Sequence, residues 1–283
     1  MADTSLDLKV LGQWIGRSEQ FTDTLDCRQA DLLMATLDRS ETTWPGQELP
    51  PLWHWIYFLS GLPQSQLGRD GHPALGGFLP PVALPRRMWA GSRVEFLAPA
   101  RLGGSCTKTS TVKDLQLKEG RSGTLCFVTV LHTVEDEQGE VLIREEQDIV
   151  YREDPSPDAP SLKVPAAPEN PAASTTITPT TVQLFRYSAL TFNGHRIHYD
   201  REYCQTVEGY PGLVFHGPLT ATLLAQFAGD HSQGRRMKNF SFRAISPLFD
   251  THPITLAGDG DGAVWAANHR GELAMKADVV WHT

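Results

Sequence analysis

The chain has 283 residues, of which 40% are hydrophobic and 20% are charged, a composition typical of a soluble globular protein with one large or two modest domains. Its formal net charge of −8 makes a nucleic acid an unfavourable partner, because the phosphate backbone carries charge of the same sign. The four cysteines are scattered and form no CxxC pair, so the sequence suggests neither a zinc ribbon, nor a thioredoxin-type centre, nor a disulfide scaffold.

The first ten residues, MADTSLDLKV, contain neither the basic nor the apolar segment of a signal peptide. The most apolar run, LWHWIYFLSGL at residues 52–62, is too short to span a bilayer and contains His54. We therefore expect a cytoplasmic protein with reduced, buried cysteines and no membrane partner.

The first half of the chain shows two helical patterns and four strand patterns. A helix is predicted over residues 26–38, because its apolar residues follow the helical period: Ala30, Leu33, Met34 and Leu37. A second, short and buried helix is predicted for PPLWHWIYFLSG, which opens on prolines. The strand patterns are SRVEFLAP, GSCTKTSTVKDLQLK, GTLCFVTVLHTVEDE and VLIREEQDIVYRE, with turns at Gly120, Gly123 and Gly139.

Residues 153–180 form the one clear shift in composition. They contain seven of the twenty prolines of the chain. Proline removes a backbone donor and fixes φ, so this stretch is predicted to be neither helix nor central strand. We interpret it as a mostly extended linker between two units, residues 1–152 and residues 181–283.

The second half repeats the plan in shorter form. VQLFRYSALTF is interpreted as a strand, and GPLTATLLAQFAGDH as a helix with Pro218 in its first turn. Further strands are predicted for KNFSFRAISPLF, PITLAGDGDGAVWAAN and GELAMKADVVW, with GDGDG as a tight turn. The two halves also share a faint similarity, RRMWAGSRVEFLAPARLGG at residues 86–104 and RRMKNFSFRAISPLFDT at residues 235–251. Together with the element order, this predicts a duplicated α+β unit in which an antiparallel sheet wraps a helix.

The segment FNGHRIHYD has the side chains for proton transfer. Asn193 and His198 are five residues apart with Gly194 between them, so the loop can turn both side chains into one cavity. Neutral histidine suits proton transfer near pH 7, whereas asparagine can hold a water or a carbonyl oxygen but cannot act as a base.

A second feature lies in VFHGPLTATLL, where Gly217 directly precedes the predicted helix. A backbone N–H at the positive end of a helix can stabilise a carbonyl oxygen that gains negative charge. Such a donor is worth about 3 kcal/mol in well-studied cases, and the missing Cβ lets a substrate carbonyl approach. Base, water holder and oxyanion donor together suit the addition of water to a double bond conjugated with a thioester.

These two segments, YSALTFNGHRIHYD and GLVFHGPLTATLL, resemble the hydratase motif of the MaoC-like, hot-dog fold enoyl-CoA hydratases and hydroxyacyl-thioester dehydratases. That motif reads roughly (S/T)GDxNPxH, followed by HG at the central helix. His198 falls on its catalytic histidine, and His216 with Gly217 fall on its HG pair. The resemblance implies an α+β double hot-dog fold, in which two antiparallel sheets each wrap a central helix. Residues 1–152 would then be a degenerate unit and residues 181–283 the catalytic unit.

The chain departs from this motif at three positions. The family usually has aspartate where this chain has Asn193, and asparagine-proline where it has His195 and Arg196. This version, with its proline-rich middle, is similar to the mitochondrial-type dehydratases and to the itaconyl-CoA or mesaconyl-C4-CoA hydratases. The resemblance then implies that His198 carries most of the proton transfer while Asn193 positions the water. Asp200 and His195 stay open as contributors.

The implied function is reversible hydration of a short, C5-dicarboxylic enoyl-CoA, from itaconyl-CoA or mesaconyl-C4-CoA to citramalyl-CoA, in itaconate catabolism. Coenzyme A enters only as part of the substrate, and no other cofactor is expected. Open sheet edges commonly pair, so we expect a homodimer. An arginine is expected at the tip of the acyl cavity, Arg186 or Arg243. The remaining substrate-binding candidates are Tyr187 and His216, and the pairs Arg86–Arg87 and Arg235–Arg236 for the phosphates of coenzyme A.

Other interpretations stay open at this point. The protein could be a 3-hydroxyacyl-ACP or -CoA dehydratase of fatty-acid synthesis, a non-catalytic acyl-CoA-binding subunit, or a hot-dog thioesterase. A metal site at His195, His198 and His216 lacks an obvious acidic or cysteine partner, so none is expected. The GDGDG segment offers too few oxygen ligands for calcium. The WHW run at residues 53–55 is interpreted as core that could also wall the acyl cavity.

Overall fold

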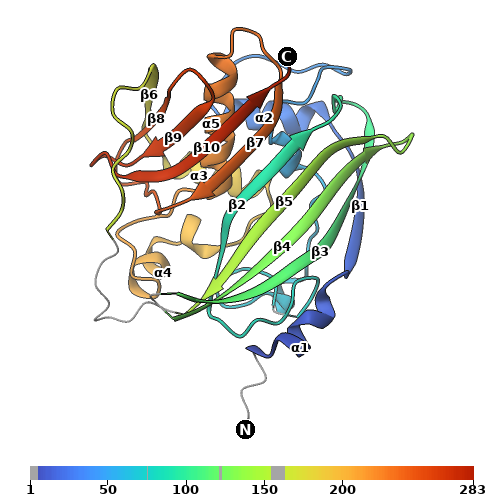
Figure 1. The fold of residues 1–283 in the computed structure, drawn as a ribbon, viewed down its shortest axis with the longest axis vertical. Coiled ribbons are helices and arrows are strands. Elements are labelled where there is room, and N and C mark those ends of the chain that lie inside the picture. The colour runs from blue at the N-terminus through green and yellow to red at the C-terminus, as the bar shows by residue number, and fades with distance from the viewer. Residues whose placement is uncertain (1–5, 75, 121–122, 154–162) are drawn as a thin grey trace.

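The computed structural model describes residues 6–74, 76–120, 123–153 and 163–283. Its ten strands form one continuous antiparallel sheet in the order β1-β3-β4-β5-β2-β7-β10-β9-β8-β6 (Figure 1). The strands of the first half are β1 (Ser18–Thr24), β2 (Arg86–Phe96), β3 (Ser105–Gly120), β4 (Gly123–Asp136) and β5 (Val141–Arg152). Those of the second half are β6 (Ala173–Ile177), β7 (Met237–Ala244), β8 (Ile254–Gly258), β9 (Ala263–Ala267) and β10 (Leu273–Trp281).

The strand order is symmetric about the contact between β2 and β7. Each strand of the first half has a counterpart at the equivalent place in the second half, since β1, β3, β4, β5 and β2 match β6, β8, β9, β10 and β7. The two segments with the faint sequence similarity contain β2 and β7, which pair antiparallel with Ser92 opposite Phe242 and Val94 opposite Phe240. The duplicated unit predicted from the sequence is therefore present, and its two copies join through the repeated segment itself.

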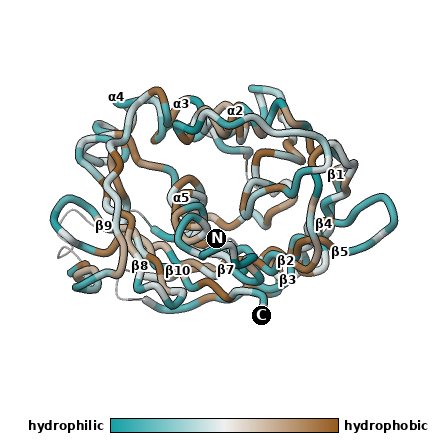
Figure 2. The backbone as a smooth tube through the Cα atoms, turned by 90° about the horizontal axis from the view of Figure 1, so that it is seen from above, coloured by the Kyte–Doolittle hydropathy of each residue, from teal (hydrophilic) through white to brown (hydrophobic). Residues whose placement is uncertain are grey.

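Three helices organise the space on the inner side of the sheet. Helix α5 (Gly217–Asp230) packs on β7, β8, β9 and β10. Helices α2 (Cys27–Thr36) and α3 (Thr181–Leu190) contact each other and cover α5 on the side away from the sheet (Figure 2). Helix α5 is apolar on nearly all sides because it is enclosed by both layers. The predicted central helix of the second unit is thus confirmed, with Pro218 in its first turn.

In the first half, the place over the sheet is taken by a much shorter element. The predicted buried helix is a single turn of 3-10 helix, η3 (Trp53–Ile56), within a largely irregular segment. Leu52, Trp53 and Ile56 join the core with Val94 and Phe96 of β2. One turn covers less of a sheet than the 14 residues of α5 do, so part of the inner face of β3, β4 and β5 is left to line a cavity.

The strand predicted for VQLFRYSALTF is wrong, because these residues form α3. The side chain of Thr180 caps the helix by accepting the N–H of Gln183. Leu184 and Tyr187 are buried, whereas Val182 and Phe185 are exposed. Large apolar residues on the solvent side obscured the helical period and imitated a strand.

The remaining elements are short or polar. The predicted linker contains the edge strand β6, which pairs with β8. The sheet of the second half therefore begins before residue 181. Residues 154–162 of the linker lie outside the described ranges. The polar strand β1 and the short helices α1 (Leu8–Leu11) and α4 (Arg201–Thr206) were not predicted. The other 3-10 turns are η2 (Gly12–Trp14), η4 (Gln64–Gln66) and η5 (Arg196–His198). Within the described ranges, no helix has both the length and the apolar character needed to cross a membrane.

Candidate active site

The loop that joins α3 to η5 carries the first group of candidate residues. Asn193 uses its side-chain oxygen to accept the N–H of His195 at 3.0 Å, and its own N–H bonds to the carbonyl of Ser188 at 2.8 Å. The Asn193 side chain therefore fixes the turn, as asparagine often does, and its NH2 group, which makes no hydrogen bond with a described residue, has both donors available to a ligand.

His198 is buried at the end of this loop, with 7% of its surface exposed. Its Nδ1 lies 2.8 Å from the carbonyl oxygen of Val214. A carbonyl can only accept, so Nδ1 carries the proton and Nε2 holds the lone pair in the neutral ring. Burial lowers the pKa of His198 to about 4, which keeps the ring neutral near pH 7 and leaves Nε2 as a base.

His216 lies against His198 and precedes α5. The two imidazoles stack with centroids 3.7 Å apart and planes 18° apart, and the ring of Tyr187 meets His216 edge-on at 5.0 Å. His216 Nε2 is 2.9 Å from Ser188 Oγ. Burial, followed by the charge of His198, lowers the pKa of His216 well below its usual range. The imidazole of His216 is thus neutral, and its stacking holds the ring of His198 in place.

The first turn of α5 is consequently open. His216 stands at the N-cap position, but its side chain bonds to Ser188 and does not cap the helix. A Cβ built on Gly217 would meet no atom within 4 Å, so open space adjoins the start of the helix. An uncapped helix N-terminus beside open space can receive an oxyanion.

A cavity of about 260 Å³ is lined by both halves of the chain and reaches Asn193, Tyr187 and Pro218, which adjoin His198, His216 and Gly217, although these three do not themselves line it. The second half contributes Tyr187, Thr191, Asn193 and Pro218. The first half contributes His54, Trp55, Trp89, Lys108, His132, Glu145 and Gln147. The WHW segment therefore serves both interpreted roles, since Trp53 belongs to the core while His54 and Trp55 wall the cavity.

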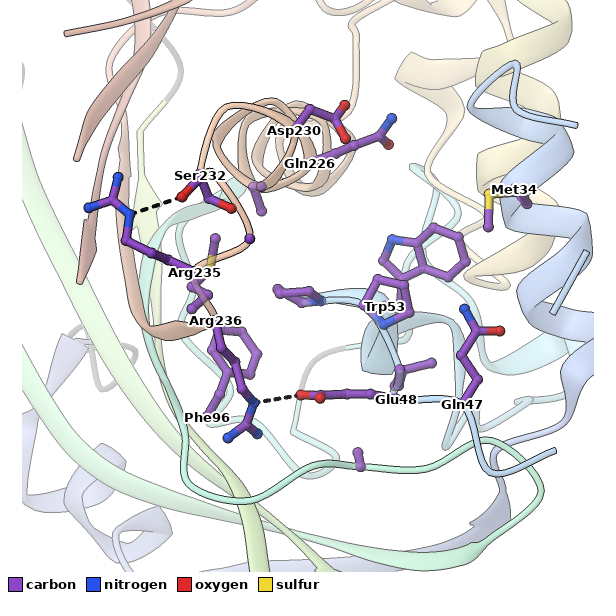
Figure 3. Close-up of a pocket in the computed structure, with 18 of the residues that line it drawn as sticks. Met34, Gln47, Glu48, Trp53, Phe96, Gln226, Asp230, Ser232, Arg235 and Arg236 are labelled. Carbon is purple, nitrogen blue, oxygen red and sulfur yellow. Dashed lines mark hydrogen bonds and ion pairs between the residues drawn. The ribbon is translucent and has the colours of Figure 1, made fainter. Parts of the chain in front are cut away.

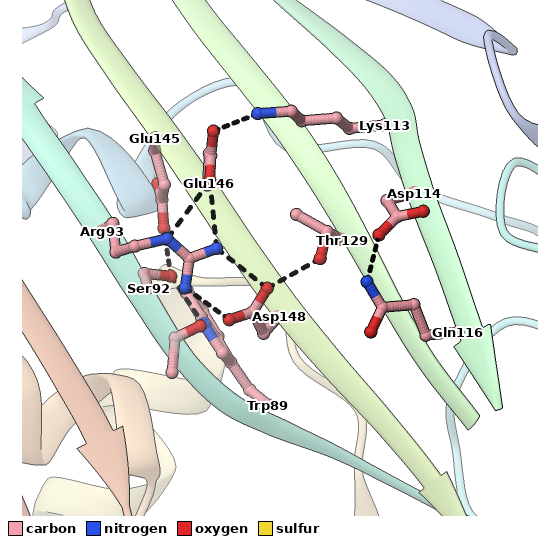
Figure 4. Close-up of polar contacts among 11 residues, drawn as sticks. Trp89, Ser92, Arg93, Lys113, Asp114, Gln116, Thr129, Glu145, Glu146 and Asp148 are labelled. Atoms are coloured by element: carbon pink, nitrogen blue, oxygen red, sulfur yellow. Dashed lines mark hydrogen bonds and ion pairs between the residues drawn. The ribbon is translucent and has the colours of Figure 1, made fainter. Parts of the chain in front are cut away.

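Glu145 organises the wall that the first half contributes, and Figure 4 shows it beside Ser92. This fully buried carboxylate accepts hydrogen bonds from Ser92 Oγ at 2.7 Å, Trp55 Nε1 at 2.9 Å and His54 Nε2 at 3.0 Å. Burial is the largest single influence and would raise the pKa of Glu145, but the hydrogen bond and charge of His54, the charge of His132 and the hydrogen bond from Trp55 together outweigh it, and the pKa falls to about 2. Glu145 is thus an ionised anchor that fixes Trp55, which meets the ring of Trp89 edge-on at 4.8 Å.

A loop of the first half braces the loop that carries His198. The carbonyl of Asp70 accepts the N–H of Arg196 at 2.9 Å, and Asp70 Oδ2 lies 2.9 Å from His72 Nδ1. The ring of His72 is 4.0 Å from the ring of His195, which in turn meets His198 edge-on at 5.5 Å. The sequence analysis missed Asp70 and His72, because contacts across more than 120 residues leave no mark in local spacing.

Asp70, His72 and His195 are also the set of described residues that could hold a metal ion, since their donor atoms lie within 4.8 Å of one another. The set weighed from the sequence is not among the described groups with converging donor atoms, and His216 Nε2 and His198 Nδ1 are instead hydrogen-bonded to Ser188 and Val214. The GDGDG segment is a turn, in which Asp259 Oδ1 accepts the N–H groups of residues 261, 262 and 263.

The structure separates the predicted arginines into two groups. Arg235 and Arg236 lie near the far end of α5, in a second cavity of about 530 Å³ (Figure 3). Arg236 Nε is 2.8 Å from Glu48 Oε1, whereas Arg235 donates to the carbonyl of Ser232 and lies over the ring of Trp281. This cavity is therefore polar at its rim and distinct from the one beside Asn193.

Arg86 and Arg87 begin β2, near the loop of the first half. Arg86 donates to the Tyr210 hydroxyl and to the carbonyl of Glu208, and its NH2 lies 3.5 Å from the Glu208 carboxylate. Arg87 stands opposite Tyr151 in the pairing of β2 with β5. Burial is the largest cause that lowers the pKa of His72, and the charge of Arg87 lowers it further. Arg86 is thus held by other parts of the chain.

Three further candidates lie away from the cavity. Arg186 on α3 and Arg243 on β7 are exposed and do not line the 260 Å³ cavity, so neither stands at the tip expected to bind an acyl carboxylate. Asp200 caps α4 by accepting the N–H of Tyr203 and pairs with Arg196 at 2.8 Å. These contacts give Asp200 a structural role.

Comparison with known proteins shows consistent similarities. Residues 52–250 match the family of hydroxyacyl-thioester dehydratase type 2. The chain is 49% identical to a mesaconyl-C(4)-CoA hydratase of Chloroflexus aurantiacus, over 88% of this chain and 89% of that protein. A solved MaoC-like dehydratase aligns over 96% of this chain and all of that one, with a TM-score of 0.70 and 14% identity. A Mycobacterium tuberculosis protein with a double hot-dog fold aligns over 95% of this chain and 96% of that one, with a TM-score of 0.51 and 14% identity. The predicted α+β double hot-dog fold is confirmed.

Proposed function

Because the chain belongs to the hydroxyacyl-thioester dehydratase type 2 family, we propose that it adds water reversibly to a short, C5-dicarboxylic enoyl-CoA. The substrate would be mesaconyl-C4-CoA or itaconyl-CoA, the product citramalyl-CoA, and the setting itaconate catabolism in the cytoplasm. The identity of 49% with a mesaconyl-C(4)-CoA hydratase supports this substrate class. The cavity of about 260 Å³ is small beside the roughly 300–1,000 Å³ of most ligand pockets, which favours a short acyl group.

One observation carries the proposal: a neutral imidazole with a free Nε2 lies beside the uncapped start of α5. In the hydration of mesaconyl-C4-CoA, whose double bond is conjugated with the thioester, His198 Nε2 takes a proton from water as the oxygen bonds to the β-carbon. The π electrons of the double bond move toward the thioester and form an enolate, whose oxygen accepts the N–H of Gly217. The imidazolium then returns the proton to the α-carbon, so that water has been added and His198 is neutral again.

Asn193 has a different role from the aspartate that usually occupies this position in the family motif. Its oxygen is engaged by the N–H of His195, so its NH2 group is what faces the attacking water or the substrate in the cavity it lines. An amide cannot act as a general acid or base at neutral pH, which leaves both proton transfers to His198. The reaction needs no group beyond the coenzyme A of the substrate.

Coenzyme A extends along α5 in this proposal. The 14 residues of this helix span about 21 Å at 1.5 Å per residue, from Gly217 to the cavity that holds Arg235. The Arg235 guanidinium makes no ion pair with a described residue, whereas Arg236 is paired with Glu48. Arg235 is therefore the stronger candidate for a phosphate contact. A homodimer would form through an open edge of the sheet, at β1 or β6.

Substrate preference tests the proposal directly. Purified protein is expected to hydrate mesaconyl-C4-CoA or itaconyl-CoA with a higher kcat/KM than crotonyl-CoA, followed by the loss of enoyl absorbance. A preference for crotonyl-CoA or longer chains would instead identify a fatty-acid dehydratase. Binding without turnover would identify an acyl-CoA-binding subunit, and release of free thiol would identify a thioesterase.

Replacing Gly217 with proline tests the oxyanion donor. Gly217 is the first residue of α5, where proline is well tolerated, and His216 already has φ −60° and ψ 130°, which suit a residue before proline. Gly217→Pro removes one N–H and is expected to lower kcat by about 10²–10³-fold. Gly217→Ala keeps the donor and adds only a Cβ to the open space beside the start of α5, so its loss measures the steric part alone and should be the smaller of the two. Equal losses in the two variants would rule out an oxyanion contact at this amide.

A further inference from the structure

A row of polar side chains crosses the inner face of the first-half sheet. Ser110 of β3 stands opposite His132 of β4, and His132 stands opposite Glu145 of β5. Lys108 precedes Ser110 by two residues and so points to the same face. The inner face of such a sheet normally packs into an apolar core, as Val134 and Val130 do on either side of His132. Polar side chains at these positions indicate that this part of the face binds a polar ligand.

Most members of this row are already satisfied within the protein. Glu145 accepts from three donors. His132 Nε2 lies 3.1 Å from Gln147 Oε1, and its Nδ1 lies 2.8 Å from Ser110 Oγ. An amide oxygen can only accept, so His132 donates from Nε2 and receives the Ser110 hydroxyl proton at Nδ1. These contacts hold the wall of the cavity but leave no charge free for a ligand.

Lys108 is the exception. Its ammonium group makes no hydrogen bond or ion pair with any residue in the described part of the chain, and it lies 5.5 Å from the centroid of the Phe58 ring. Burial lowers the pKa of Lys108, although the charges of Glu145 and Glu19 oppose this. A partly buried cation without an acceptor is unfavourable unless a ligand supplies one. Lys108 lines the same cavity as Asn193 and Pro218.

We propose that Lys108 binds the free carboxylate of the acyl group and so selects dicarboxylic over neutral enoyl-CoA substrates. This inference rests on the proposed hydratase function and adds the residue that recognises the substrate class. In mesaconyl-C4-CoA the free carboxylate is bonded to the β-carbon, so it occupies the same small cavity as the reacting atoms. Lys108 supplies the charge expected there, which neither Arg186 nor Arg243 reaches. The ammonium group can donate up to three hydrogen bonds to this carboxylate.

The test compares Lys108→Met with the wild type on a charged and a neutral substrate. The variant is expected to lower kcat/KM for mesaconyl-C4-CoA by about 10- to 150-fold, the range for a hydrogen bond to a charged group. Its kcat/KM for crotonyl-CoA should stay within about threefold of the wild-type value, because that acyl group has no carboxylate. Lys108→Arg keeps the positive charge and should recover part of the loss.

Lys113→Met is the matched control. Lys113 also lies on β3, but it pairs with Glu146 on the outer face of the sheet (Figure 4), so its replacement should leave both substrates unaffected. An equal loss on both substrates in Lys108→Met, with hydration intact in the wild type, would overturn the role of Lys108 but not the proposed function. If the wild type hydrates neither substrate, the proposed function fails. Calorimetric binding then tests Lys108 alone, and a carboxylate preference that survives Lys108→Met would refute its role.

Discussion

Replacing His198 with alanine is expected to lower kcat for enoyl-CoA hydration by about 10²–10⁴-fold, the usual contribution of a positioned general acid–base group. KM should change little, because the phosphates and the acyl carboxylate are bound elsewhere. His198 is the candidate because its Nδ1 is fixed by the carbonyl of Val214, which leaves Nε2 as a base. Steady-state rates with mesaconyl-C4-CoA measure the effect.

His231→Ala is the control for this variant. His231 Nδ1 also lies 2.8 Å from a carbonyl, that of Phe227 at the far end of α5. Its replacement removes the same kind of hydrogen bond and should leave kcat unchanged. Circular dichroism of both variants shows whether the fold is retained. A His198→Ala enzyme that is folded and works at the wild-type rate would exclude His198 as the base.

The pH profile of the wild type gives a second measure of the same residue. The base must be neutral to accept a proton, and burial lowers the pKa of His198 to about 4. Therefore kcat/KM should stay level from neutral pH down to about pH 5 and fall as the pH drops through about 4. Three histidines surround His198, namely His195, His216 and His72, and burial lowers the pKa of each as well. An acid limb near 6.5, the pKa of an exposed histidine, would show that a different group acts as the base.

Replacing Gly71 with alanine is expected to destabilise the protein by about 3 kcal/mol or more. Gly71 has φ +87°, and a Cβ there would lie 1.9 Å from the carbonyl oxygen of Gly194. A left-handed φ alone costs a residue with a Cβ about 1–2 kcal/mol, and relief of the clash must move the backbone of one loop. The midpoint of urea unfolding measures the loss.

Gly139→Ala separates the cost of the left-handed φ from the cost of the steric clash. Gly139 has a similar φ of +82°, but a Cβ there would meet no atom within 4 Å. Its replacement should cost only the conformational part, about 1–2 kcal/mol, with activity unchanged. Gly71→Ala should also lose activity, because Gly194 lies in the loop that carries His198. Equal unfolding midpoints for the two variants would show that the two loops are not closely docked.

The sequence predicted those parts of the fold whose pattern is local. Helix α5 begins on Gly217 and Pro218, and most of the long strands coincide with apolar and β-branched runs bounded by glycine. Strand β1, SEQFTDT, has no apolar alternation on its exposed face, because Ser18, Gln20 and Thr22 there bond to threonines of β3. Helix α3 was mistaken for a strand because apolar residues occupy its exposed side.

The residues of the candidate site also fall into two groups, those in local motifs and those that only long-range pairing brings together. His198, Asn193, His216 and Gly217 belong to two short segments, so a local pattern could predict them, and their roles stay predictions. Lys108 and Glu145 are 37 positions apart and meet only because β3, β4 and β5 align them across one sheet face. The partners of the predicted arginines, such as Glu208 for Arg86, are equally remote in sequence. Register and long-range pairing decide these positions, and neither is visible in one sequence.

The short 3-10 turn at Trp53–Ile56 has a consequence for how this enzyme can be altered. In a dimer of two identical units, both units must carry the same side chains. In a chain that contains both units, the sequence of each unit can change independently of the other. In the proposed site the reacting groups come from the second copy, whereas the first copy, which has a short turn in place of a long helix, lines the cavity. Substrate range can therefore be redesigned on β3, β4 and β5 while the segments that perform the chemistry stay untouched.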